Sequence, residues 1–114
     1  MKMKIFHVED DTLWREDITD HLKELGHTVV SCSMMTEAVE ILSKSRDDFD
    51  VFICDGSIDK QDDGRKLAKE LFNEGRKVVV ISLSWENDLS GIPSINKGEF
   101  EYQKLDDILN GFSK

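Results

Sequence analysis

The chain has 114 residues, of which 34% are charged, with a formal net charge of −9 and a pI near 4.7. This length fits one ordinary domain with its own hydrophobic core and is too short for two. The negative charge argues against nucleic acid or an anionic membrane surface as the main partner, because both are polyanions. Protein partners of basic or mixed charge fit better.

The N-terminus contains no recognisable targeting segment. Only a few apolar residues follow Met1-Lys2-Met3-Lys4 before an acidic cluster, so neither a signal peptide nor a membrane span can be placed there. We therefore expect a cytoplasmic protein that does not associate with membranes.

The two cysteines indicate buried, reduced thiols. Cys32 and Cys54 lack CxxC spacing, and each lies within a strand-like run. A disulfide or a metal site is accordingly not expected.

In the first half of the chain, strand-like and helix-like segments alternate. Residues 4–8 predict a strand, and residues 12–25 predict an amphipathic helix that Thr12 caps and Gly26 ends. A strand over residues 28–33, a helix over residues 37–44 and a buried strand over residues 50–54 complete this half.

The alternation continues in the second half of the chain. The predicted elements are a helix over residues 65–73, a strand over 77–83, a strand over 99–103 and a helix over 105–112. Residues 85–98 predict a short turn or an irregular loop, because Gly91, Pro93 and Gly98 interrupt them. Strands that alternate with helices predict an α/β fold, with a parallel sheet covered by helices.

Charged residues follow closely after three of the apolar runs. Glu9-Asp10-Asp11 come after residues 5–8, Asp55 comes after residues 51–54, and Lys104 comes soon after Phe100-Glu101-Tyr102. The carboxyl ends of parallel strands lie along one edge of a sheet, so these side chains should converge there. Carboxylates packed so closely need a hard cation, and Mg²⁺ prefers carboxylate, carbonyl and water oxygens. The pattern predicts metal-assisted phosphoryl chemistry.

Over essentially its whole length, the chain resembles the receiver domain of two-component response regulators. That family carries an acidic pair after the first strand, an aspartate after the third, an Asp-Gly before the third helix, a Ser or Thr after the fourth strand and a Lys after the fifth. The corresponding residues are Glu9-Asp10, Asp55, Asp63-Gly64, Ser82 and Lys104. The resemblance implies a doubly wound, five-stranded parallel sheet of flavodoxin-like order 2-1-3-4-5 with helices on both faces, the fourth helix being short or irregular.

The resemblance also implies the chemistry of the site. Asp55 would be the phosphoacceptor, which takes a phosphoryl group from a phosphohistidine on a histidine kinase or a histidine phosphotransfer protein. Asp10, Asp55 and the backbone carbonyl of Ser57 would bind Mg²⁺, with Glu9 acting through water or orienting the other ligands. The phosphotransfer and autodephosphorylation would be self-catalysed, without an enzyme's turnover.

Two further residues would hold the phosphoryl group. Ser82 would donate a hydrogen bond to it, and Lys104 would offset its charge, which would switch a surface that binds a downstream protein target. Lys97 is the alternative for the site lysine. Lys104 is preferred because residues 100–103 resemble the strand that should carry the lysine, whereas Lys97 is close to Ser82 in the sequence.

Several residues depart from the family pattern. Leu83 stands where receivers usually carry a small residue, and a bulky side chain there could narrow access to Asp55. Leu105 replaces a proline, and Ile58-Asp59 replaces a hydrophobic-proline pair. Residues 85–93 have poor helix character, so a remodelled output surface is expected, with Trp85 as one candidate contact.

Several hypotheses on the domain organisation and the function of the chain stay open. We expect residues 1–114 to be a single receiver domain without an effector domain, with a segment of a longer hybrid protein as the alternative. The main functional alternative is a degenerate receiver that docks proteins without phosphorylation. A Mg²⁺-dependent phosphohydrolase is disfavoured, because Asp55-Gly56-Ser57 lacks a second acid two residues after Asp55.

Overall fold

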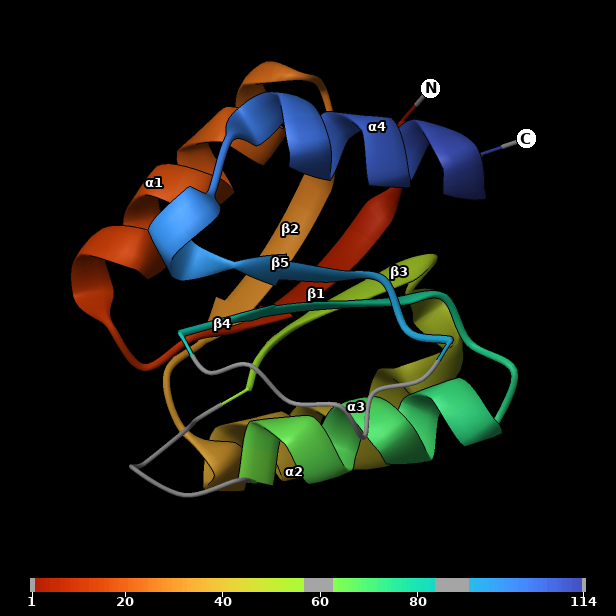
Figure 1. Cartoon of the computed structure of the whole chain (residues 1–114). Helices are drawn as coiled ribbons and strands as arrows, with labels where there is room; N and C mark the ends of the chain where they lie inside the picture. The colour runs from red at the N-terminus through yellow and green to blue at the C-terminus, as the bar shows by residue number, and fades with distance from the viewer. Residues whose placement is uncertain (1, 57–62, 84–90, 114) are drawn as a thin grey trace.

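A computed structural model of the chain describes residues 2–56, 63–83 and 91–113. Its five strands form one parallel sheet in the order β2-β1-β3-β4-β5 (Figure 1). The strands are β1 (Lys4–Val8), β2 (Thr28–Cys32), β3 (Val51–Asp55), β4 (Val78–Ser82) and β5 (Ser94–Asn96). The predicted fold class and strand order are confirmed.

Helices cover both faces of this sheet. They are α1 (Thr12–Glu24), α2 (Met35–Ser45), α3 (Asp63–Asn73) and α4 (Tyr102–Phe112), with two short 3₁₀ turns, η1 (Arg46–Asp48) and η2 (Lys97–Glu99). Figure 1 shows α1 and α4 on one face and α2 and α3 on the other. No helix within the described ranges is long and apolar enough to cross a membrane.

The core consists of two apolar layers, one on each side of the sheet. Successive strand residues point to opposite faces, so Phe6 packs toward α2 and α3 whereas Ile5 packs toward α1 and α4. Every residue of β3 and β4 is buried. This burial on both faces explains why these strands are nearly continuous runs of apolar residues.

The ends of the helices follow local rules. Asp11, rather than the predicted Thr12, caps α1, because its carboxylate accepts the backbone N–H of Trp14 at 3.1 Å. Gly26 and Gly75 have φ values of 94° and 86°. Both follow helices in the left-handed conformation that glycine adopts most readily, and the predicted end of the first helix at Gly26 is confirmed.

The position predicted for the fifth strand is wrong. Residues 99–103 contain the end of η2 and the start of α4, whereas β5 lies at Ser94–Asn96 in register with Val80–Ser82. Phe100 and Tyr102 do not join the sheet but pack edge to face with a ring-centroid distance of 5.0 Å. Of residues 85–98, the segment predicted to be a turn or an irregular loop, β5 and the start of η2 occupy 94–98. Residues 85–90 with Trp85 lie outside the described residues, as do Ile58 and Asp59.

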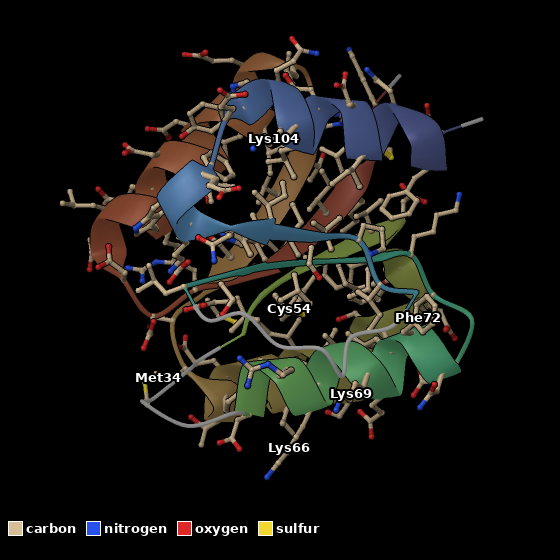
Figure 2. The ribbon with its side chains drawn as sticks, viewed as in Figure 1. Met34, Cys54, Lys66, Lys69, Phe72 and Lys104 are labelled. Atoms are coloured by element: carbon tan, nitrogen blue, oxygen red, sulfur yellow. The ribbon has the colours of Figure 1, made fainter. Side chains whose placement is uncertain are left out.

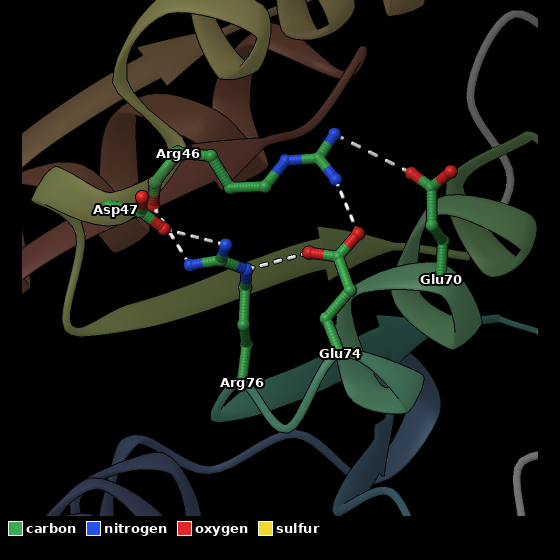
Figure 3. A network of polar contacts seen from close by, with 5 residues as sticks. All are labelled: Arg46, Asp47, Glu70, Glu74 and Arg76. Carbon is green, nitrogen blue, oxygen red and sulfur yellow. Dashed lines mark hydrogen bonds and ion pairs between the residues drawn. The ribbon is translucent and has the colours of Figure 1, made fainter.

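A polar network joins α3 and the segment after it to η1, near the amino ends of β3 and β4 (Figure 3). Arg76 donates to Asp47 and to Glu74, each at 2.7 Å, and Arg46 pairs with Glu70 and Glu74. The hydrogen bond from Arg76 lowers the pKa of Glu74. This network lies at the end of the sheet opposite the carboxyl ends of the strands, so we assign it to stability rather than to the site described below.

Both cysteines are buried and unpaired, as predicted. Val8 pairs with Cys32 on one side and with Cys54 on the other, so a whole strand separates the two thiols. Burial raises the pKa of Cys32 to about 11 and that of Cys54 to about 12. Neither thiol has the low pKa of a reactive cysteine.

Neither cysteine should react with Ellman's reagent in the folded protein at pH 8, because both thiols are buried and protonated. The guanidinium-unfolded protein serves as the control and should release two equivalents of thionitrobenzoate. Reaction of the folded protein at the rate of the unfolded protein would contradict this assignment.

Candidate functional site

Three carboxylates meet at the carboxyl ends of β1 and β3. Ligand oxygens of Glu9, Asp10 and Asp55 lie within 4.8 Å of one another. The sequence brings them together because β1 and β3 are hydrogen-bonded neighbours, with Val8 paired to Cys54. Glu9 is 1% exposed and Asp55 is 4% exposed, whereas Asp10 faces solvent. Carboxylates this close and this buried must be balanced by positive charge.

Lys97 supplies positive charge to this cluster. Its Nζ lies 2.9 Å from Glu9 Oε1 and 3.6 Å from Asp55 Oδ2, and its side chain is only 6% exposed. Lys97 directly follows β5, just as the carboxylates lie at or just beyond the ends of their strands. The ammonium also lies 5.1 Å from the ring centroid of Trp14, which provides a cation–π contact from α1.

The prediction that Lys104 belongs to the site is wrong. Lys104 lies on α4, is exposed, and donates through Nζ to the carbonyl oxygen of Glu99 at 2.8 Å. Figure 2 shows it in the helical layer above the sheet. The error follows from the misplaced fifth strand. Lys97, the alternative named from the sequence, would have been preferred by the rule that located Asp55, a charged residue directly after a strand, had Ser94-Ile95-Asn96 been recognised as that strand.

Ser82 lies beside the backbone that follows Asp55. It ends β4 and is 5% exposed. A Cβ atom on Gly56 would lie 2.7 Å from Ser82 Oγ, so only glycine at position 56 allows this approach without displacement. Ser82 therefore lies at the same corner as Asp55, where the sequence placed it. Ser57, the predicted source of a carbonyl ligand, lies outside the described residues.

Backbone contacts fix the loop that carries the acidic residues. Glu9 Oε2 accepts the N–H of Asp11 at 3.1 Å, and Arg15 donates to the carbonyl oxygen of Glu9 at 3.0 Å. Burial lowers the pKa of His7 to about 3, with additional effects from Arg15 and Lys97. His7 is therefore neutral near pH 7 and adds no positive charge to the cluster.

Leu83 follows Ser82 but does not pack into this corner. Its side chain is 73% exposed, so most of it faces solvent rather than the buried carboxylates. Leu83 is therefore an exposed apolar residue beside the site.

These features define a class of protein: a doubly wound α/β domain with a cluster of acidic residues, a lysine and a hydroxyl at the carboxyl edge of its sheet. Such an edge is where open α/β sheets bind ligands. The family model for the response regulator receiver domain matches residues 5–98. The chain belongs to this family, and the matched region includes Lys97 but not Lys104.

Individual relatives agree with this assignment. The two-component response regulator ARR11 of Arabidopsis thaliana is 26% identical over 101 residues, which are 88% of this chain and 19% of that protein. The chain thus spans about a fifth of the length of this curated relative.

Solved structures show the same fold. Response regulator TrrA of Thermotoga maritima, in complex with Mg²⁺-BeF, has a TM-score of 0.82 at 21% identity, covering 98% of this chain and 99% of its own. The Vibrio cholerae chemotaxis protein CheY4 has a TM-score of 0.79 at 18% identity, with coverage of 98% and 99%.

Replacing Lys97 should destabilise the protein far more than replacing Lys104. In EDTA, Lys97→Met should lower the free energy of unfolding by about 3 kcal/mol, because it leaves buried carboxylates without their cation. Lys104→Met should change it by less than about 0.5 kcal/mol, because that lysine is exposed. Urea denaturation measures both, and equal losses would contradict the placement of Lys97.

Proposed function

We propose that this chain is the phosphoacceptor receiver of a two-component phosphorelay. Asp55 takes a phosphoryl group from a phosphohistidine on a histidine kinase or a histidine phosphotransfer protein. The observation that carries the proposal is the surroundings of Asp55: a buried carboxylate grouped with Glu9 and Asp10, with Lys97 Nζ at 3.6 Å. The family match and the two-component relative support it.

The residues present fit a Mg²⁺ ion. Glu9, Asp10 and Asp55 offer oxygen ligands close enough together to share one ion, and Asp10 is accessible to solvent, from which retained waters would come. Bound there, Mg²⁺ would offset negative charge on the oxygens of the transferring phosphoryl group. Mg²⁺ would thus add positive charge to that of Lys97.

Asp55 is the best candidate for the nucleophile among the three carboxylates. Glu9 is engaged by the Asp11 N–H and by Lys97, and Asp10 lies on the solvent side. Asp55 lies between the acidic loop after β1 and the Ser82–Gly56 contact. Its carboxylate oxygen forms a bond to phosphorus as the bond from phosphorus to the histidine nitrogen breaks.

The phosphorylated carboxylate changes the charge balance of the site. The phosphoryl group carries roughly −1.5 to −2 charges at pH 7 and replaces the −1 of the Asp55 carboxylate, so the site gains about −0.5 to −1 of charge. Lys97 then has a stronger anionic partner than Glu9, and the Ser82 hydroxyl donates to a phosphoryl oxygen. Because Lys97 begins η2 and contacts Trp14 of α1, its movement alters the surface of α1 and of the segment after β5, where a downstream protein binds.

Acetyl phosphate with Mg²⁺ should add one phosphoryl mass to the wild-type protein. Asp55→Asn should abolish the gain, because the nucleophile is lost. The matched control is Asp20→Asn, an exposed aspartate on α1, which should be labelled like the wild type. Intact-mass spectrometry measures all three proteins.

Two outcomes of this experiment would overturn the proposal. No mass gain in the wild type would favour the receiver that docks proteins without phosphorylation. Release of many equivalents of phosphate per protein, without a stable adduct, would favour the phosphohydrolase.

A further inference from the structure

Arg65 lies on the face of α3 that packs against the sheet. Arg65 is only 4% exposed. It directly follows Gly64 in the first turn of the helix, and it precedes the core residue Ala68 by about one turn. The next residue, Lys66, extends from the opposite side of the helix into solvent (Figure 2). A buried guanidinium is rare unless anions balance it. The position of Arg65 therefore requires an anionic environment.

The guanidinium of Arg65 reaches the corner that holds Asp55. Its Nη2 lies 3.5 Å from the point where a Cβ atom on Gly56 would be, and Ser82 Oγ lies 2.7 Å from the same point. Gly56 directly follows Asp55. The Arg65 guanidinium and the Ser82 hydroxyl thus both border the backbone immediately after the candidate phosphoacceptor.

Arg65 and Lys97 approach this corner from opposite faces of the sheet. Lys97 contacts Trp14, which packs with the layer beneath α1 and α4. Arg65 comes from α3, whose apolar residues belong to the other layer. A group attached to Asp55 would have a cation on each side.

The charge balance gives the second cation a role. Lys97 and a divalent ion together match the three carboxylates. A phosphoryl group of about −1.5 to −2 replaces the −1 of the Asp55 carboxylate, so the site gains about −0.5 to −1 of charge, which those two cations leave unmatched. A guanidinium presents parallel N–H donors that suit phosphoryl oxygens, which a lysine ammonium does not. We propose that Arg65 is a second cationic ligand of the phosphoryl group on Asp55. This inference rests on the proposed function, since it adds a ligand to the same site.

The test compares Arg65→Met with Lys66→Met, which removes the same charge from the neighbouring, exposed position of the same helix. Isothermal titration calorimetry in saturating Mg²⁺ measures the affinity for beryllofluoride, a phosphoryl mimic. Arg65→Met should weaken it by about tenfold or more, the effect of losing a charge-assisted hydrogen bond. Lys66→Met should stay within about twofold of the wild type, because an exposed charge interacts weakly.

Mg²⁺ affinity separates a ligand role from a structural role. Arg65→Met should bind Mg²⁺ as tightly as the wild type or more tightly, because a cation near the carboxylates is removed. Parallel losses of Mg²⁺ and beryllofluoride affinity would mean that the site has collapsed and would overturn the inference. Should Arg65→Met not fold, Arg65→Gln takes its place, with the same expected loss of beryllofluoride affinity.

The outcomes distinguish this inference from the proposed function. Failure of the wild type to bind beryllofluoride and to be labelled by acetyl phosphate would remove the proposed function, and this inference with it. A labelled wild type combined with wild-type beryllofluoride affinity in the Arg65 variant would overturn this inference alone.

Discussion

The crowding of Glu9, Asp10 and Asp55 at one edge of the sheet is the constraint on which the rest of the site depends. Strand pairing forces these carboxylates together, and burial of Glu9 and Asp55 makes their repulsion costly. The protein offsets part of that cost with Lys97, which is itself buried. Neither the carboxylates nor the ammonium would be stable there alone, so the site is a balance of charges that a metal ion or a phosphoryl group can shift.

A continuous series of contacts begins at Lys97. Trp14 packs on Phe100 at 5.3 Å, Phe100 on Tyr102 at 5.0 Å, and Tyr102 stacks on His21 at 4.2 Å, between ring centroids. His21 in turn pairs with Asp106 across α1 and α4 at 2.8 Å. Movement of Lys97 would therefore first change the surroundings of the Trp14 ring, whose fluorescence reports on the site.

The sequence predicted the fold because strands buried on both faces, such as residues 51–54, give strong local signals. Asp55, Glu9, Asp10 and Ser82 could be placed for the same reason, since each lies at or beside the end of such a strand. Lys97 was ranked below Lys104 because β5 has only three residues with a single buried apolar side chain, Ile95, whereas Phe100 and Tyr102 alternate with polar residues as in a strand. Arg65 gave no local signal, because burial of a charged residue depends on tertiary contacts that periodicity does not reveal.

Amide chemical-shift mapping of the ¹⁵N-labelled wild-type protein, titrated first with Mg²⁺ and then with beryllofluoride, tests the charge balance at this edge most directly. The account predicts that Mg²⁺ shifts the amides of Glu9, Asp10 and Asp55. Beryllofluoride should then shift the Ser82 and Lys97 amides and the Trp14 indole. Shifts from Mg²⁺ scattered over exposed acidic residues such as Asp47 and Asp107, with none at Asp55, would contradict it.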